Sequence, residues 1–203
     1  MKQVAIITGA SGGIGRAISL NLCKQGYQLI LLGRNPKKLS SLTTECEALS
    51  GKASYFAGDF LDPDYLRLIE KTIIDQPKNI TVLINNVGIA LRGPFYESEI
   101  KDWTEIIELN VGTALKLSRA VIPQMIDRRR GTIINISSLS GRFTSSGSAL
   151  YATTKHALNG LSGGMYEDIR EFNIKVSAIM PGFVDTDLAS DLGRDKKKML
   201  TPN

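Results

Sequence analysis

The feature that most constrains this chain is the alternation of short apolar segments with amphipathic segments of helical periodicity. Such segments are typical of strands buried on both faces of a sheet and of the helices that cover them. The pattern predicts six strands, at 4–7, 29–32, 53–57, 81–84, 132–136 and 174–179. Helices are predicted at 14–24, 36–49, after Pro63, at about 103–126 and at about 150–171. We therefore predict an α/β fold with a doubly wound parallel sheet.

The length of 203 residues favours a single domain, residues 1–203. The predicted strands occupy nearly the whole chain, and no linker or repeat divides it. Hydrophobic residues make up 42% and charged residues 22%, as in globular proteins, which excludes a disordered or fibrous chain. The net charge of +5 suits an anionic ligand, but it does not require nucleic acid, and we predict no nucleic-acid partner.

The two cysteines, Cys23 and Cys46, form no CxxC pair. This spacing argues against a metal site and against a disulfide framework, so we interpret both as reduced thiols of a cytoplasmic protein. No stretch of about 18 apolar residues occurs, and the amino terminus meets glycines at once. We therefore expect neither a signal peptide nor a membrane span.

A glycine-rich turn follows the first predicted strand and leads into the first helix. It reads TGASGGIG, with glycines at positions 9, 13 and 15. Glycines permit a tight turn and the close approach of a ligand, and the free N–H groups at a helix start favour a diphosphate. A plain tight turn is the alternative, but this place in an open sheet favours a dinucleotide site.

The second predicted strand ends in LLGRN, where NAD-binding sheets usually offer a carboxylate to the ribose 2′-hydroxyl. Here Gly33 offers none, and Arg34 presents a guanidinium that can bind a 2′-phosphate. We therefore predict NADP(H) in preference to NAD(H). The alternative is that Arg34 is a solvated loop cation.

Polar residues also follow the third and fourth strands. Asp59 is placed to accept from an adenine amino group, or simply to cap the next helix. The INNVG segment offers Asn85, Asn86 and Gly88, which can tie neighbouring strands together and let a ribose approach. For Asn85, structural support is an equal interpretation.

Acid/base chemistry is indicated after the fifth strand. Ser137 and Ser138 follow that strand, and the next helix carries Tyr151 and Lys155, four residues apart and hence on one helical face. A nearby ammonium favours the phenolate of a tyrosine and brings its pKa closer to neutral pH. Ser138 can then hold the substrate oxygen. A Tyr and a Lys four apart also occur on ordinary solvated helices, so the pair gains meaning from the glycine turn.

Six motifs occur in an order and at spacings that resemble the short-chain dehydrogenase/reductase family. They are TGASGGIG, NNVG, Asn110, the Ser138 of ISSLSG, YATTK and PGFVDTD. The resemblance covers essentially the whole chain. It implies a Rossmann sheet and an oxidoreductase that moves a hydride between NADP(H) and a carbonyl or secondary alcohol, similar to carbonyl reductases and 3-oxoacyl-carrier-protein reductases.

The resemblance also implies the site residues. The catalytic set would be Asn110, which positions a water, Ser138, which orients the substrate oxygen, Tyr151, the acid/base, and Lys155, which holds the nicotinamide ribose and lowers the pKa of Tyr151. The other cofactor-binding residues would be Gly9, Ser11, Gly13, Ile14 and Gly15 at the diphosphate, Arg34 at the 2′-phosphate, Asp59 and Phe60 at adenine, Asn86 and Gly88 at the adenosine ribose, and Pro181, Gly182, Val184 and Thr186 at the nicotinamide.

The chain departs from the family pattern at two places. Gly12 stands where NADP(H)-preferring members often add a basic residue. Members also usually continue through a further helix and a seventh strand, so we expect the last strand to be absent from this chain. The substrate loop is expected from about residue 185 onward, and it decides specificity.

Two other functions are weighed against the oxidoreductase. One is a catalytically silent dinucleotide-binding regulatory protein, which the intact Ser138, Tyr151, Lys155 and Asn110 argue against. The other is dehydration or epimerisation, which usually needs a larger substrate domain. We expect a small-molecule substrate and a homodimer or homotetramer formed through the helices at about 103–126 and 150–171. The basic runs 128–130 and 196–198 are interpreted as solvated ends, with docking of an acidic carrier protein as the alternative.

Overall fold

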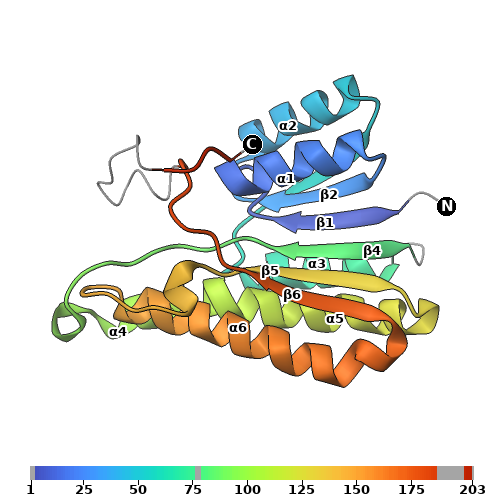
Figure 1. The fold of residues 1–203 in the computed structure, drawn as a ribbon. Coiled ribbons are helices and arrows are strands. Elements are labelled where there is room, and N and C mark those ends of the chain that lie inside the picture. The colour runs from blue at the N-terminus through green and yellow to red at the C-terminus, as the bar shows by residue number, and fades with distance from the viewer. Residues whose placement is uncertain (1–2, 76–78, 187–198, 203) are drawn as a thin grey trace.

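The fold is built on one parallel sheet of six strands. The computed structural model describes residues 3–75, 79–186 and 199–202. The strand order is β3-β2-β1-β4-β5-β6, and every neighbouring pair is parallel (Figure 1). The strands are β1 Val4–Thr8, β2 Gln28–Gly33, β3 Lys52–Ala57, β4 Ile80–Asn85, β5 Gly131–Ile136 and β6 Ile174–Ile179. The predicted sheet is confirmed, and its order reverses between β1 and β4, where ligands of such sheets bind.

Helices cover both faces of the sheet, as a doubly wound fold requires. They are α1 Gly13–Lys24, α2 Pro36–Ala48, α3 Pro63–Asp75, α4 Ile100–Ile107, α5 Thr113–Arg128 and α6 Ala149–Ile169. Helices α1 and α2 lie on one face, and α3, α5 and α6 lie on the other (Figure 1). No helix of the described part of the chain is both long and apolar enough to span a bilayer.

The helix predicted at about 103–126 is divided in the structure. A five-residue π-helical segment, Glu108–Gly112, separates α4 from α5. It carries Asn110, which is only 2% exposed. Oδ1 of Asn110 accepts a hydrogen bond from the backbone N–H of Ile89, and Nδ2 of Asn110 donates one to the carbonyl oxygen of Ile89. These bonds anchor the widened turn to the loop after β4. The apolar periodicity does not predict this interruption.

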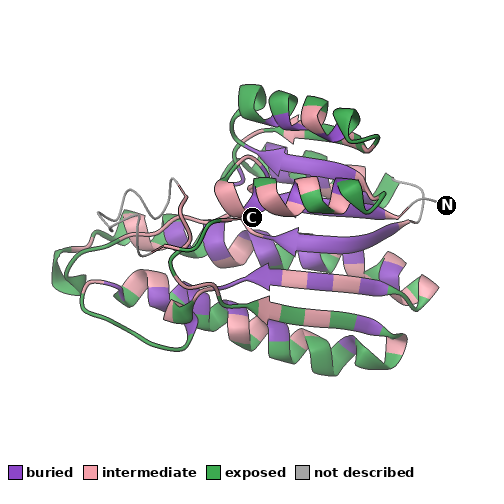
Figure 2. Ribbon diagram, turned by 45° about the horizontal axis from the view of Figure 1, so that its top comes forward, coloured by how far each residue is buried: buried purple, intermediate pink, exposed green. Residues whose placement is uncertain are grey.

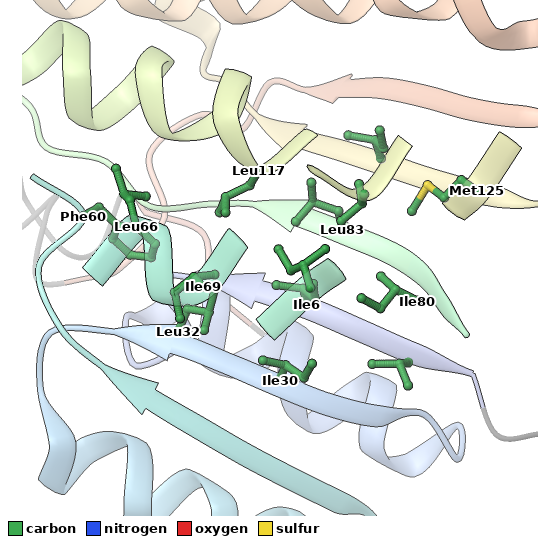
Figure 3. Packing of buried hydrophobic residues seen from close by; sticks show 14 of the residues in the cluster. Ile6, Ile30, Leu32, Phe60, Leu66, Ile69, Ile80, Leu83, Leu117 and Met125 are labelled. Atoms are coloured by element: carbon green, nitrogen blue, oxygen red, sulfur yellow. The ribbon is translucent and has the colours of Figure 1, made fainter. Parts of the chain in front are cut away.

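Two apolar cores lie on opposite faces of the sheet, because successive side chains of a strand point to opposite sides. Ile6 of β1 packs with Leu83 of β4 and Leu117 of α5 on the face covered by α3, α5 and α6 (Figure 3). Ala5 and Ile7 belong to the core under α1 and α2. The central strands β1, β2 and β4 are thus buried on both sides, whereas the edge strands β3 and β6 are largely exposed (Figure 2).

Both cysteines lie in the core between α1 and α2. Cys23 and Cys46 are free thiols with 2% and 0% exposure. Burial raises the pKa of Cys46 to about 12, and it raises the pKa of Cys23 as well. Because the thiolate is the reactive form, we expect neither thiol of the native protein to react with a disulfide reagent within minutes at neutral pH, and both to react in denaturant. Equal rates in the native and the denatured protein would contradict this placement.

Candidate active site

The turn between β1 and α1 requires glycine at several positions. Gly9 has a φ of +61°, a conformation that residues with a side chain rarely adopt. A Cβ at Gly15 would lie 2.3 Å from the carbonyl oxygen of Gly9, and one at Gly13 would lie 2.5 Å from Cγ2 of Thr186. No side chain caps the start of α1, so its first N–H groups are available to an anion. The turn therefore fits the diphosphate of a dinucleotide.

A groove extends from this turn along the ends of β2 and β4, and we call it the glycine groove. It is lined by Gly9, Ser11, Gly12, Gly13, Ile14, Gly33, Arg34, Asn35, Lys38, Phe60, Asn86, Val87, Gly88 and Thr186. Most of the residues predicted to bind the cofactor thus line one groove. The predicted cofactor-binding residues that do not line it are Gly15, Asp59, Tyr151, Lys155, Pro181, Gly182 and Val184.

Two cations line the glycine groove beside the end of β2. Arg34 was predicted from the sequence, and Lys38 was missed. Lys38 enters the groove because Asn35 caps α2, accepting from the backbone N–H of Lys38 at 3.0 Å, and Pro36 begins the helix. The sequence NPKK carried this signal, since a cap followed by proline places the next residues in the first helical turn.

The two asparagines that end β4 tie neighbouring strands together, as predicted. Nδ2 of Asn86 donates to the carbonyl oxygens of Thr8 and Gly9 at 3.0 and 3.1 Å. Nδ2 of Asn85 donates to Oδ1 of Asn135 at 2.8 Å and to Oγ of Ser118 at 3.1 Å. Asn85 is buried within the sheet, so the structural interpretation holds for it. Asn86 holds the glycine turn against β4.

The two residues predicted at adenine have structural partners. Oδ1 of Asp59 accepts from the backbone N–H of Leu61 at 3.0 Å and so caps the turn after β3. Phe60 as a whole is 2% exposed, and its ring packs edge-on against Tyr65, with 5.4 Å between the ring centroids. A contact of Phe60 with adenine therefore stays a prediction.

A second cavity, which we call the tyrosine cavity, adjoins the glycine groove. Its polar lining includes Ser138, Tyr151 and Lys155, and the segment after β6 contributes Pro181, Gly182, Val184 and Thr186. Ile14, Asn86, Gly88 and Thr186 line both hollows. A ligand that fills the glycine groove can therefore reach the side chains predicted to be catalytic.

Tyr151 and Lys155 lie on one face of α6, as their spacing predicted. Nζ of Lys155 is 5.5 Å from the centroid of the Tyr151 ring and donates to the carbonyl oxygen of Ile136 at 2.9 Å. Burial raises the pKa of Tyr151, and a hydrogen bond with Ser138 and the charge of Arg92 oppose this rise. The pKa of Tyr151 is therefore raised, whereas the sequence predicted that Lys155 would lower it. The difference arises because the effect of burial is larger than the opposing effects of Ser138 and Arg92. Arg92 was not identified from the sequence.

Lys155 is a buried ammonium, and burial lowers its pKa from 10.5 to about 8. Burial of the charged ammonium lowers the free energy of unfolding. This loss of stability is fully present below pH 8, and it disappears as the pH rises toward 10.5. At about 1.4 kcal/mol per pKa unit it amounts to about 3 kcal/mol, and the bond to Ile136 offsets about 1 kcal/mol.

We therefore expect Lys155→Met to raise the free energy of unfolding of the cofactor-free protein at pH 7 by about 2 kcal/mol, and we expect this gain to shrink above pH 8. Denaturant titrations at pH 7 and pH 9.5 measure it. Lys175→Met, which removes an exposed ammonium, is the control and should change the free energy of unfolding little. A destabilised Lys155→Met with no pH dependence would contradict the argument.

Asn110 and Ser137 form hydrogen bonds with residues of α6, the helix that carries Tyr151 and Lys155. Nδ2 of Asn110 donates to Oγ1 of Thr154 at 3.0 Å, in addition to its bond with the Ile89 carbonyl. Oγ of Ser137 donates to the carbonyl oxygen of Lys155 at 2.9 Å. Both residues thus bind α6 to the ends of the strands and hold Tyr151 and Lys155 in place. The predicted water-positioning role of Asn110 stays a prediction.

The segment expected to form the substrate loop is described only in part. The backbone N–H of Leu200 donates to the carbonyl oxygen of Phe183 at 2.8 Å, and that of Asp185 donates to Leu200 at 2.7 Å. Residues 187–198, with the basic run 196–198, lie outside the described residues. In the basic run 128–130, Arg128 donates to the carbonyl oxygens of Gln124 and Ile80. Ile80 lies at the start of β4, whereas Ser138 follows the end of β5, so Arg128 lies at the opposite end of the strands from Ser138.

Among the described residues, no group of three or more His, Cys, Asp or Glu gathers as metal ligands. The glycine turn at the switch point of a parallel sheet defines an α/β protein of the nucleotide-binding class. A model of the short chain dehydrogenase family matches residues 3–197. The chain belongs to this family, whose members are oxidoreductases acting on CH–OH or C=O groups.

Three relatives show the range of the family around this chain. The very-long-chain 3-oxoacyl-CoA reductase of Mycosarcoma maydis is 36% identical over 191 residues, which are 91% of this chain and 54% of that protein, so this chain spans about half of it. A short-chain dehydrogenase from Sphingobium yanoikuyae, solved in complex with NADPH, matches this chain with a TM-score of 0.93 and 27% identity. The match covers 98% of this chain and 80% of the Sphingobium chain. A 3-oxoacyl-[acyl-carrier protein] reductase from Brucella melitensis with bound NAD has a TM-score of 0.85 at 25% identity, covering 98% of this chain and 79% of that one.

Proposed function

We propose that this chain is an NADP(H)-dependent oxidoreductase that interconverts a carbonyl compound and a secondary alcohol, with Tyr151 as the acid/base. The observation that carries the proposal is the meeting of Ser138, Tyr151 and Lys155 in a cavity that shares four lining residues with the glycine groove. A cofactor that lies in the groove and reaches into the cavity would bring its reactive end to the acid/base residue.

The chain's own residues would act as follows. NADPH, when bound, supplies a hydride that forms the new C–H bond at the carbonyl carbon. Tyr151 donates the proton that completes the alcohol, and Ser138 donates a hydrogen bond to the same oxygen. Because burial raises the pKa of Tyr151, the hydroxyl is protonated at neutral pH, as reduction requires. In the reverse direction Tyr151 takes the proton back.

The preference for NADP(H) rests on charge at the adenosine end of the groove. Arg34 and Lys38 line it, and Gly33 leaves no carboxylate to repel a 2′-phosphate. The bound NADPH of the Sphingobium relative agrees with this preference, whereas the bound NAD of the Brucella relative shows that the family uses both cofactors.

The other predictions stay proposals of the same kind. Two of the relatives are named 3-oxoacyl-CoA reductase and 3-oxoacyl-[acyl-carrier protein] reductase, so 3-oxoacyl thioesters are among the carbonyl compounds to be tested. A single domain, a cytoplasmic location and a homo-oligomer formed through α4, α5 and α6 are also proposed. Catalytic silence is disfavoured by the assembled Ser138, Tyr151 and Lys155.

Titration of the purified protein with NADPH and NADH, followed by a panel of carbonyl compounds, tests the proposal. The panel includes 3-oxoacyl thioesters. We expect saturable binding of NADPH, weaker binding of NADH, and turnover of at least one compound of the panel. Tight binding without turnover on any member would favour the regulatory protein. An absence of binding to both nucleotides would contradict the assignment of the glycine groove.

A further inference from the structure

We propose that Arg92 recognises an anionic group of the substrate, so that the carbonyl compound this enzyme takes is an oxo acid. The inference rests on the proposed function, because it names the substrate class for the same site. It was not apparent from the sequence, where Arg92 is one cation among 25 Lys and Arg residues.

The position of Arg92 places it at the wall of the tyrosine cavity. It lies on the loop after β4 and lines the same cavity as Ser138 and Tyr151. The loop is tied to the chain before α6, because the backbone N–H of Gly93 donates to the carbonyl oxygen of Gly147 at 3.1 Å. Both glycines have positive φ values, +145° and +71°, that favour glycine. The backbone next to Arg92 is therefore held near the helix that carries Tyr151.

The charge of the cavity is one-sided. Its described lining contains Arg92 and Lys155 and no aspartate or glutamate. The ammonium of Lys155 is buried and bonds the carbonyl oxygen of Ile136. Arg92 is exposed and forms no ion pair with any residue that the structure describes. Arg92 also lines a neighbouring hollow with Glu97 and Asp102, but neither carboxylate forms an ion pair with it. A ligand that enters the tyrosine cavity therefore meets a guanidinium that has no ion-pair partner among the described residues.

Two further observations indicate that the charge of Arg92 can act on a ligand beside Tyr151. The field of Arg92 reaches Tyr151, where it opposes the rise in pKa that burial causes. Much of the remaining lining is apolar, including Leu139, Pro181 and Phe183, and apolar walls strengthen the attraction between opposite charges. A carboxylate is the group that matches the planar donor fork of arginine, so an oxo acid satisfies both Arg92 and the acid/base pair.

Paired substrates that differ only in charge test this inference. We would use 2-oxobutanoate, 3-oxobutanoate and 4-oxopentanoate, each beside its methyl ester, and dihydroxyacetone phosphate beside dihydroxyacetone to separate carboxylate from phosphate recognition. The quantity compared is the ratio of kcat/KM for the anion to kcat/KM for its neutral partner. This ratio cancels any effect of Arg92 that acts only through the pKa of Tyr151.

We expect the wild type to favour at least one oxo acid over its ester, and Arg92→Gln to lower that ratio about 30-fold, as for a lost hydrogen bond to a charged group. Arg92→Lys should restore part of it. Arg142→Gln is the matched control, because Arg142 is exposed, does not line the tyrosine cavity, and has its guanidinium 5.7 Å from the centroid of the Phe143 ring. A preference that follows the phosphate pair instead would overturn the carboxylate assignment.

Calorimetric binding of the same acids and esters to the protein, alone and with NADP⁺, decides the inference without turnover. Acids that bind no more tightly than their esters, or equal binding by wild type and Arg92→Gln, would overturn it. Tighter binding of an acid that depends on Arg92, without turnover on any substrate, would support the anion site while contradicting the proposed oxidoreductase.

Discussion

Replacement of Tyr151 with phenylalanine is expected to lower kcat by about 10³-fold, while the Kd for NADPH stays within about threefold of the wild type. The variant keeps the ring that lies against Lys155 and removes only the hydroxyl that bonds Ser138 and would exchange a proton with the substrate. The tyrosine cavity therefore keeps its shape, and the loss should appear in the chemical step. Steady-state rates and a fluorescence titration with NADPH measure the two quantities.

Tyr166→Phe is the matched control for this experiment. Tyr166 lies on the same helix, α6, but it is 42% exposed and does not line the tyrosine cavity. We expect its rates to match the wild type. If Tyr151→Phe kept rates near those of the wild type, Tyr151 would not be the acid, and the mechanism would have to be assigned to another group in the cavity.

Arg34→Asp is expected to weaken NADPH about 100-fold and to leave NADH unchanged or slightly tighter. The substitution replaces a guanidinium in the glycine groove with a carboxylate, which repels a 2′-phosphate but can accept a hydrogen bond from a ribose 2′-hydroxyl. A 100-fold change corresponds to about 3 kcal/mol, the size expected when one charge-assisted contact becomes a repulsion. Titrations with both nucleotides at one fixed ionic strength measure it.

Two variants accompany the Arg34 experiment. Lys38→Gln should weaken NADPH by about tenfold, since it removes the second cation of the groove without introducing a repulsion. Arg119→Asp makes the same change of charge on the exposed surface of α5, outside the groove, and should leave both affinities unchanged. If NADPH bound Arg34→Asp as tightly as the wild type, the 2′-phosphate would be held elsewhere.

The strands could be predicted from the sequence because their signal is local. A buried parallel strand must be apolar on both faces, so the continuous apolar runs around Ile6, Ile30 and Leu83 predict strands. The π-helical segment at Glu108–Gly112 could not be predicted in this way, because its cause is not local. It depends on bonds between Asn110 and Ile89, which approach each other only when α4 and α5 pack beside the loop after β4.

The sequence by itself determined the alternation of strands and helices, the glycine turn, and the pairing of Tyr151 with Lys155. Each of these depends on spacing along a single strand, turn or helix. Only the tertiary structure decided that Lys38 lines the same groove as Arg34 and that Arg92 lines the same cavity as Tyr151. It also decided that burial raises the pKa of that tyrosine. The physical reason is that electrostatic interaction and desolvation depend on distance and depth in the folded molecule, and these follow from packing between elements far apart in the chain.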